Sequence, residues 1–467
     1  MEAGVRGIPV SFLKSRENEA KTRESGGEMR KLFILYGPQG AGKTTFVQEN
    51  KLDEFSVNAD EVRRMFSRYV PALDGDKVLI AGEHLQRLTR RIVQEQADNL
   101  MFLGSPVIID AVNASPRSRS QWEALADSHG YDVLAVDFTQ VSREELLSRN
   151  LKRGGDRIPD IESFLDRFDS VPPPQTITPA QMLDCFKTCQ VDLGNRPVRV
   201  VGDVQSCGGA LEQAVAELGT PDAKWIFVGD LFDRGPDAGK VWKILRSVDN
   251  VVITGNHEKS LLNALKGRGT KSATEESVKQ LLTAGATRQQ LEDWYRSTVP
   301  FYDFRVGGTP ATPSASEVPG TKSGAEKRPG AREYFVSHGG VYPETIREIR
   351  RTGYCDLPDD YFIFGVGTRA NTYRRRYEFK NFPEMGDHEI VQLHGHRNES
   401  RENFVNPGVI DLESGVEKDG WLSVYAIDGV TGEGQIHKYR EPRDCDDRNT
   451  LVNPVKSPRS VYFAPLT

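Results

Sequence analysis

Two groups of residues in this 467-residue chain have the types and spacing that phosphate chemistry requires. The first is "GPQGAGKT" at residues 37–44, a complete G-x-x-x-x-G-K-[ST] loop between the apolar strand "LFILY" and a helical stretch. Backbone N–H groups of such a loop surround phosphates, and the helix N-terminus adds positive potential. The motif predicts a nucleotide site formed by Gly37, Gly40, Gly42, Lys43 on the β/γ-phosphates and Thr44 on Mg²⁺.

The second group follows three apolar strands, in "PVRVVGDVQ", "WIFVGDLFDRG" and "VVITGNHE". Asp203, Asp230 and Asn256 each close a strand, 27 and 26 residues apart, close to the roughly 30 residues of one βαβ unit. Successive parallel strands would bring them to one edge of a sheet. With His338 in "FVSHGG" and His396 in "LHGHR", they form a donor set that suits two divalent ions, which support in-line phosphoryl displacement.

The stretch "VNADEVRR" suggests residues that would bind and activate the molecule that accepts the phosphate. At the end of a strand, Asp60 would face the nucleotide as a general base, and Arg63, one turn on, would hold a second phosphate. An acidic helix cap beside a solvated arginine explains the same spacing equally well. Arg149 and Arg153, at i and i+4, suit a lid that stabilises a transferring phosphoryl group, although a solvated basic face is the ordinary alternative.

The elements that must position these residues form two alternating series of apolar strands and helical stretches, which is typical of α/β domains. Three consecutive prolines near residue 172 separate them, and a stretch rich in Gly, Pro and Ser interrupts the second. The predicted organisation is a flexible tail (1–30), a first domain (31–171), a linker (172–196), a second domain (197–441) with a disordered insert (306–332), and a second tail (442–467).

The net charge, the cysteine count and the lack of long apolar runs argue against several classes of function. The net charge of −6 argues against a general nucleic-acid coat, but it allows an enzyme with a local basic groove, for which residues 367–382 are a candidate. Five cysteines without a CxxC pair indicate reduced thiols rather than a zinc site. No apolar run approaches a membrane span and the start of the chain lacks an apolar signal core, so the expected compartment is the cytoplasm, without a membrane partner.

The stretch from "PVIIDAVNAS" to "LKRGGDRIP", with the two motifs above, resembles the kinase domain of polynucleotide 5′-kinase/3′-phosphatases over most of residues 31–170. The resemblance implies that Lys43 and Thr44 hold ATP and its Mg²⁺. It makes Asp60 the general base for a 5′-hydroxyl, and Arg63 the contact to the acceptor's phosphate.

The same resemblance makes Arg153, together with Arg149, the lid arginine. Ala111 stands where the phage type of the family has Asp. Asp110 beside it fits the "IDATN"-like version of the bacterial type, and this departure leaves the role of Asp110 open.

In the second domain, the order GD-x-[HQ], GD-x-x-DRG, GNHE, SHGG and GH resembles calcineurin-like metallophosphatases over residues 197–440. It is most similar to the diadenosine tetraphosphate hydrolase branch and to the phosphatase module of bacterial RNA-repair enzymes. The resemblance implies an α/β sandwich with two metal sites that share a carboxylate. The implied ligands are Asp203, Gln205 and Asp230 for the first metal and Asp230, Asn256, His338 and His396 for the second.

The resemblance also implies the catalytic groups. Arg234 would hold the phosphate, and His257 would protonate the leaving oxygen with Asp233 orienting it. Asp411 matches an acidic position of the RNA-repair branch less securely. His394 has no family role, so a structural part is expected.

One ligand departs from the family pattern. Gln205 stands where most members have His, and its neutral carbonyl oxygen favours harder ions such as Mn²⁺. Some diadenosine tetraphosphate hydrolases also have Gln there, so the change does not indicate an inactive site.

The leading hypothesis is therefore an end-healing enzyme that phosphorylates 5′-hydroxyls with ATP and removes 3′-phosphates, or 2′,3′-cyclic phosphates, from RNA in preference to DNA. No ligase-like K-x-D-G motif is present, so a separate ligase is the expected partner. A second hypothesis gives the phosphatase a dinucleotide polyphosphate. A third makes the second domain a non-catalytic, metal-binding scaffold, against which its full ligand set counts.

Overall fold

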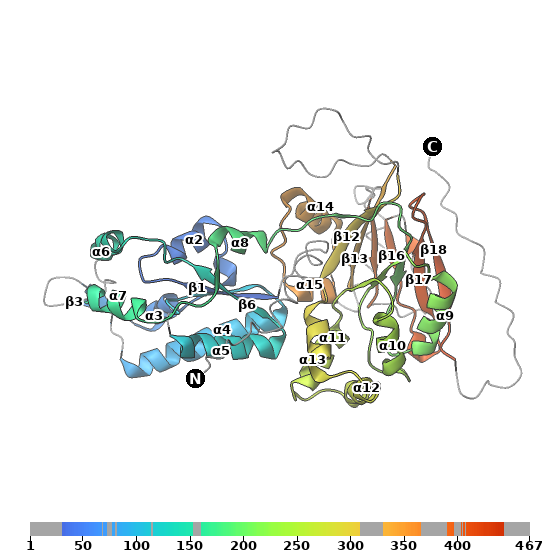
Figure 1. Ribbon diagram of the computed structural model, residues 1–467, viewed down its shortest axis with the longest axis horizontal. Coiled ribbons are helices and arrows are strands. Elements are labelled where there is room, and N and C mark those ends of the chain that lie inside the picture. The colour runs from blue at the N-terminus through green and yellow to red at the C-terminus, as the bar shows by residue number, and fades with distance from the viewer. Residues whose placement is uncertain are drawn as a thin grey trace, which may run out of the picture. The chain divides into compact units, whose positions relative to one another are not determined.

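The computed structural model in Figure 1 describes residues 30–67, 69–71, 77–79, 82–113, 115–152, 160–308, 330–365, 390–396, 403, 405–406 and 408–442. The chain divides into two compact units. Residues 28–187 and 355–359 form the first, here called the P-loop unit. Residues 188–354 and those from 360 onward form the sandwich unit.

The P-loop unit is built on a parallel sheet. In its described part the strand order is β2-β5-β1-β6-β7, and every pairing is parallel. The strands are β1 (Lys31–Tyr36), β2 (Ser56–Asn58), β5 (Val107–Asp110), β6 (Asp132–Asp137) and β7 (Thr176–Ile177). A separate hairpin pairs β3 (Tyr69–Pro71) with β4 (Lys77–Leu79).

Helices cover both faces of this sheet (Figure 1). Alternate residues of β1 point to opposite faces. Leu32 and Ile34 pack with α4 and α5, whereas Phe33 and Leu35 pack on the side of α2, α6, α7 and α8. The helices are α2 (Lys43–Glu49), α3 (Ala59–Phe66), α4 (Glu83–Leu103), α5 (Pro116–His129), α6 (Arg143–Leu151), α7 (Ile161–Asp169) and α8 (Pro179–Asp184). The result is a three-layer α/β/α unit.

The interval 172–196, predicted as a linker, is instead structured. β7 adds a strand at the β6 edge, and α8 begins at a capping box of Thr178 and Gln181. Met182 and Phe186 are buried in the core of the P-loop unit, so this unit runs to residue 187 rather than 171. β8 (Val191–Asp192) already pairs with β12 of the sandwich unit. The prolines mark a break in helical periodicity, not the end of the domain.

The sandwich unit contains two mixed sheets. The described strands of one have the order β11-β10-β9-β17-β18, and those of the other β15-β16-β14-β13-β12-β8. Their bounds are β9 (Val198–Val201), β10 (Lys224–Phe227), β11 (Asn250–Val252), β12 (Phe301–Val306), β13 (Arg332–Ser337), β14 (Ile390–His394), β15 (Val405–Asn406), β16 (Val409–Asp411), β17 (Leu422–Ile427) and β18 (Gly434–Tyr439).

The two sheets pack face to face, with helices outside them. Ile226 and Val228 lie between the sheets, whereas Trp225 and Phe227, on the opposite face of β10, pack against α9–α13. Phe362 of α15 contacts Phe301 on the outer face of the second sheet. The helices are α9 (Gly208–Leu218), α10 (Ala238–Leu245), α11 (Asn256–Leu265), α12 (Ser272–Thr283), α13 (Arg288–Arg296), α14 (Pro343–Thr352) and α15 (Asp359–Phe364). The predicted α/β fold class, a parallel-sheet unit followed by a sandwich, is confirmed.

The other predicted boundaries need small corrections. β12 extends to Val306 and β13 starts at Arg332, so the ends of the predicted insert are strand, and residues 309–329 lie outside the described residues. Arg30, assigned to the first tail, is buried and forms an ion pair with Asp359. Residues 1–29, 367–382 and 443–467 also lie outside the described residues. No described helix combines the length and apolarity needed to cross a lipid bilayer.

Candidate active sites

The loop of residues 37–44 joins β1 to α2, as the motif requires. A Cβ atom on Gly37 would lie 2.9 Å from the Cβ of Phe138, and Gly42 has φ 94°, so neither position accepts an ordinary side chain without strain. Lys43 is buried, and its Nζ donates to the carbonyl oxygens of Gly37 and Pro38, each at 2.8 Å. The lysine is therefore held over its own loop.

The predicted donor and acceptor residues line one cavity of about 920 Å³. Lys43 and Thr44 lie on the loop side, and Asp60 and Arg63 come from α3. Asp110, Asn113 and Arg149 also line it. The geometry thus brings together residues that are up to about a hundred positions apart in the sequence.

Asp60 and Arg63 form an ion pair in the first turns of α3. The sequence also allowed Asp60 to be the cap of this helix. In the structure the cap is Asn58, the last residue of β2. Its Oδ1 accepts the N–H groups of Asp60, at 2.8 Å, and Glu61, at 3.3 Å. Asp60 is therefore inside the helix with its carboxylate available to the cavity and to Arg63.

Asp110, whose role the sequence left open, ends β5 next to the loop. Its Oδ2 accepts the hydroxyl of Thr44 at 2.6 Å and the Nδ2 of Asn58 at 2.7 Å. A carboxylate beside the loop threonine suits the water shell of a nucleotide-bound Mg²⁺, a hard ion that prefers oxygen ligands. Thr44 and Asp110 are the residues that fit such an ion.

Arg149 lies near the end of α6. Its Nη1 donates to the carbonyl of Gly40 at 2.9 Å, and its Nε donates to Glu145 at 2.7 Å. The arginine thus contacts the phosphate loop instead of facing only solvent. Arg153, its predicted partner on the same helical face, follows the last residue of α6 and lies outside the described residues.

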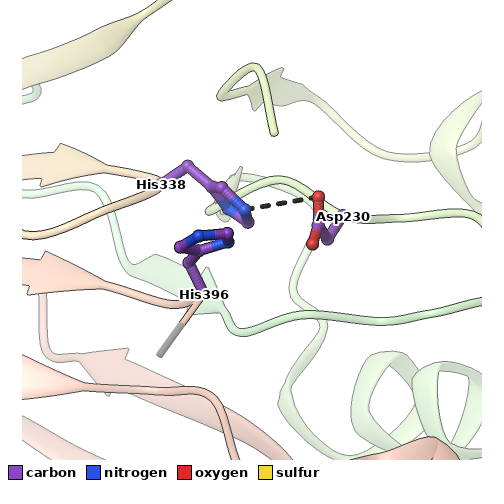
Figure 2. A group of neighbouring side chains, drawn as sticks. All are labelled: Asp230, His338 and His396. Atoms are coloured by element: carbon purple, nitrogen blue, oxygen red, sulfur yellow. Dashed lines mark ion pairs between the residues drawn. The ribbon is translucent and has the colours of Figure 1, made fainter. Parts of the chain in front are cut away.

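In the sandwich unit, the predicted metal ligands meet where the strands end. Asp203 and Asp230 follow β9 and β10, Asn256 begins α11, and His338 and His396 follow β13 and β14. Asp230, His338 and His396 point toward one another, with ligand atoms within 4.8 Å of one another (Figure 2). The two imidazole rings lie 4.8 Å apart by their centroids.

Hydrogen bonds orient the first of these histidines. The Nδ1 of His338 lies 2.8 Å from the carbonyl of Val228, so Nδ1 carries a proton and donates it. Its Nε2 is 3.3 Å from Asp230 Oδ1 and 3.4 Å from Asn256 Oδ1. Three predicted ligands of the second metal therefore converge on one point, with an imidazole nitrogen in the orientation that ligation needs.

The electrostatics of this cluster favour a cation. Burial alone lowers the pKa of His338, but Asp230 and Asp203 outweigh burial and raise this pKa to about 10. Burial raises the pKa of Asp230, yet His338, His257 and His396 bring it below its ordinary value. Burial and the nearby Glu413 raise the pKa of Asp203 well above its ordinary value. Metal ions compete with protons for such groups.

A direct test of metal fit comes from Gln205. Its Oε1 is buried and accepts no hydrogen bond from any described residue, while its Nε2 lies 3.4 Å from Asp230 Oδ2. A buried acceptor without a donor is costly unless a cation or water satisfies it. The glutamine carbonyl beside the shared carboxylate therefore fits a metal ligand, and the donor set implies divalent metals.

The backbone around the cluster is strained. Nine non-glycine residues in the described part of the chain have positive φ, and six of them lie here: Gln205, Ser206, Asp230, Asp233, Arg234 and His396. Such conformations cost about 1–3 kcal/mol each and concentrate at functional sites. A Cβ atom on Gly395 would lie 2.0 Å from Asp203 Oδ1, so the turn that presents His396 requires glycine at 395.

The predicted catalytic residues surround the cluster. His257 forms an ion pair through Nδ1 with Asp233 Oδ2 at 2.5 Å, and its Nε2 is 3.7 Å from Asp230 Oδ2. Arg234 places Nη2 at 3.2 Å from His257 Nε2 and donates through Nη1 to Glu417 at 3.0 Å. The arginine and the imidazole therefore present polar atoms to the same space.

Three supporting residues were missed by the sequence analysis. Glu258 is buried and accepts the N–H groups of Asp230, Leu231 and Gly255 at 2.8–2.9 Å, which fixes two ligand loops. Its position three residues after Gly255 in the capping-box pattern was a usable signal. Ser277 and Glu417 had no local signal, because each reaches the site only through the fold.

Ser277 lies on α12 and supports the loop of Asp233. The backbone N–H of Asp233 donates to Ser277 Oγ at 3.1 Å and to Ser206 Oγ at 3.0 Å.

Asp411 and His394 pair in register on β16 and β14, and the carboxylate is 4.0 Å from the imidazole. Both are buried behind the His396 turn, and neither belongs to the three-residue metal cluster.

Comparisons with known proteins agree with this geometry. The profile of the calcineurin-like phosphoesterase family matches residues 196–439, more than half of the chain. The chain belongs to this family. A second profile, described as an AAA domain, matches residues 32–169. This calcineurin-like phosphoesterase thus carries an additional P-loop domain of the AAA type.

Among curated relatives, the symmetrical bis(5′-nucleosyl)-tetraphosphatase of Acidovorax sp. (strain JS42) is 32% identical over 100 residues, which cover 21% of this chain. The chain spans about a third of the length of the curated relatives that it matches, 35% of this one.

Solved structures align with parts of the chain. A putative diadenosine tetraphosphatase aligns at 17% identity with a TM-score of 0.34, over 54% of this chain and 99% of its own. A chain of the Pnkp1/Rnl/Hen1 complex aligns at 18% identity with a TM-score of 0.24, over 55% of this chain and 75% of its own.

Proposed function

We propose that this protein repairs broken nucleic-acid ends. The P-loop unit would transfer the γ-phosphoryl group of ATP to a 5′-hydroxyl. The sandwich unit would remove a 3′-phosphate, or open a 2′,3′-cyclic phosphate and then remove it. The observation that carries the proposal is the cavity that Lys43 and Thr44 share with Asp60 and Arg63, because it combines a phosphate-donor site with a base and a cation for an acceptor.

In the kinase reaction, the loop N–H groups and Lys43 would hold the β- and γ-phosphates of ATP. The carboxylate of Asp60 would accept the proton of the attacking 5′-hydroxyl. Arg63 would release Asp60 and bind the phosphate of the acceptor strand. Arg149, already at the loop carbonyl of Gly40, would stabilise charge on the transferring group, together with Arg153.

In the phosphatase reaction, Asp203, Gln205 and Asp230 would hold one divalent ion, and Asp230, Asn256, His338 and His396 a second. Two such ions, when bound, supply Lewis-acid stabilisation of the phosphoryl group, and the glutamine oxygen favours Mn²⁺. Arg234 would bind a phosphate oxygen, and Glu417 fixes the direction of its guanidinium.

The proton for the leaving oxygen would come from Nε2 of His257. Burial alone lowers the pKa of His257, but Asp233 and Asp230 outweigh burial and raise it above its ordinary value. A raised pKa favours the imidazolium form, which carries the proton that a general acid donates. The ion pair with Asp233 holds Nδ1 and leaves Nε2 to face the substrate, as a general acid requires.

RNA is the favoured substrate in this proposal, and a separate ligase would seal the repaired ends. A second candidate function, hydrolysis of dinucleotide polyphosphates by the sandwich unit, is favoured by the similarity to the tetraphosphatase of Acidovorax and by Gln205 at the shared metal site. The two functions differ only in the substrate of the sandwich unit, so one experiment separates them.

The experiment uses a short RNA with a 5′-hydroxyl and a 3′-phosphate, incubated with ATP, Mg²⁺ and Mn²⁺, and mass spectrometry of each end. We expect both ends to change, with Lys43→Ala losing only the 5′ reaction and Asp230→Ala only the 3′ reaction. A parallel reaction contains diadenosine tetraphosphate, and hydrolysis of this compound with a surviving 3′-phosphate on the RNA would favour the second candidate. If neither end changes, the proposal is wrong.

A further inference from the structure

The side chain of Asn58 connects two parts of the proposed kinase site that lie in separate sequence motifs, the phosphate loop with Asp110 and the helix with Asp60. Asn58 is buried at the junction of β2 and α3. Its Oδ1 accepts the N–H groups of Asp60 and Glu61, and its Nδ2 donates to Asp110 Oδ2 at 2.7 Å. If the amide were flipped, Nδ2 would face the two backbone N–H groups and Oδ1 would face the carboxylate of Asp110. These partners therefore determine which end of the amide is the oxygen.

The connection continues to the phosphate loop. Asp110 accepts the hydroxyl of Thr44 at the same Oδ2, at 2.6 Å. Asn58 and Asp110 are register partners on the adjacent strands β2 and β5, which fixes the distance between them. A continuous path of hydrogen bonds therefore runs from the threonine of the loop to the backbone of the helix that carries Asp60.

We infer that Asn58 is a positioning residue that couples the metal side of the kinase site to the acceptor side. Its donor end holds the carboxylate of Asp110 beside Thr44, and its acceptor end caps α3 and so holds Asp60 over the cavity. The inference rests on the proposed kinase function for Asp60, but the contact to Asp110 concerns nucleotide and Mg²⁺ alone. A primary amide has both a donor and an acceptor, and this position uses both.

Other cap residues separate the two contacts. Serine and threonine are helix caps whose single hydroxyl, held at the N–H groups of α3, is too short to reach Asp110 as well, so Asn58→Ser and Asn58→Thr keep the acceptor for α3 and remove the donor to Asp110. Alanine removes both. A matched control is Thr178→Ala, which removes a cap from α8 in the same unit but does not touch the cavity.

The experiment measures the dissociation constant of ATP with and without Mg²⁺, the kcat and KM for a 5′-hydroxyl RNA, and the melting temperature. In Asn58→Ser we expect the gain in ATP affinity on adding Mg²⁺ to fall about tenfold, as for partners of metal-site ligands, with the KM for RNA unchanged. In Asn58→Ala we expect kcat for RNA to fall at least a further tenfold, because a small misplacement of the base is costly. Thr178→Ala should change only the melting temperature.

An unchanged effect of Mg²⁺ on ATP binding in Asn58→Ser would overturn the inference, and so would equal kinetic losses in the serine and alanine variants. If the serine variant does not fold, Asn58→Thr provides the same test. If wild-type protein binds ATP with Mg²⁺ but phosphorylates no 5′-hydroxyl, the proposed function fails while the binding comparison still decides the link between Asn58 and Asp110.

Discussion

The P-loop cavity and the Asp–His cluster both collect charged groups for phosphate chemistry, but they are built differently. In the cavity the side chains of Asp60 and Arg63 are 54% and 33% exposed, and they neutralise each other in an ion pair. In the cluster those of Asp230 and His338 are 4% and 0% exposed. The first site is open to solvent, whereas the second is closed around its own side chains.

The backbone shows the same difference. The described residues that line the cavity include only one strained non-glycine residue, Asn113. Six strained residues lie around the cluster, and Glu258 and Ser277 accept backbone N–H groups of two of them, Asp230 and Asp233. An open site can obtain its final geometry from ATP and the acceptor, but a buried group of like-charged carboxylates must be positioned by the protein before the metals bind.

The largest effect is expected at the shared carboxylate. Asp230→Asn should lower phosphatase activity by more than about a thousandfold, because it would remove the carboxylate proposed to bind both metal ions, and such ions supply several kcal/mol of stabilisation. Phosphatase assays with Mn²⁺ check this, with 5′-phosphorylation by the same preparation as one control. Asp293→Asn, the same change on an exposed turn of α13, should have no effect. Retained activity would show that the cluster is not the catalytic centre.

A smaller but still large loss of activity is expected from a substitution in the P-loop cavity. Lys43→Ala should lower kinase activity by about 10²–10³-fold, the usual cost of removing one preorganised donor to a transition state. Transfer of phosphate from ATP to 5′-hydroxyl RNA is the measurement. Lys187→Ala, an exposed lysine of the same unit, provides the control. An equal loss in both variants would indicate a general charge effect rather than a specific contact.

Metal removal should affect the two units differently. At a metal concentration a hundred times the dissociation constant, binding stabilises the folded state by about 2.7 kcal/mol. Treatment with a chelator should therefore lower the melting temperature of the sandwich unit by roughly 5–10 °C. Calorimetry resolves the two transitions, and that of the P-loop unit should not move. A chelator-insensitive sandwich transition would contradict the metal assignment.

The smallest effect is expected from the support of the strained loop. Ser277→Ala removes one of two hydroxyls that accept the N–H of Asp233, which should lower the kcat of the phosphatase about tenfold, at about 1.4 kcal/mol. Ser247→Ala, an exposed serine at the end of α10, is the matched control. A fall in melting temperature without a change in kcat would limit Ser277 to a structural role.

Much of both sites could be read from local sequence. A glycine loop after an apolar strand specifies its own conformation, and polar residues that end successive parallel strands must meet at one edge. For this reason the positions of Lys43, Thr44, Asp203 and Asp230 follow from spacing alone.

The interval 172–196 shows where local sequence was insufficient. Its three consecutive prolines, which break the periodicity, indicated a linker, but a two-residue strand and a six-residue helix gain their stability from the sheet edge and core they join. The helix and strand propensities of the residues themselves do not include that contribution. The amide of Asn58 is similar, because its cap could be expected from the junction but its contact to Asp110 depends on the pairing of β2 with β5.

By itself the sequence determined the α/β class, the loop, and the order of ligand-bearing strands, because these depend on short-range patterns and on the fixed geometry of strands. Only the tertiary structure decided that Asp60 and Arg63 share a cavity with Lys43 and that Ser277 and Glu417 contact Asp233 and Arg234. It also decided that the buried Oε1 of Gln205 has no hydrogen-bond partner among the described residues. Those contacts join residues far apart in the chain, and burial and hydrogen bonding between distant elements leave no periodic signal in the sequence.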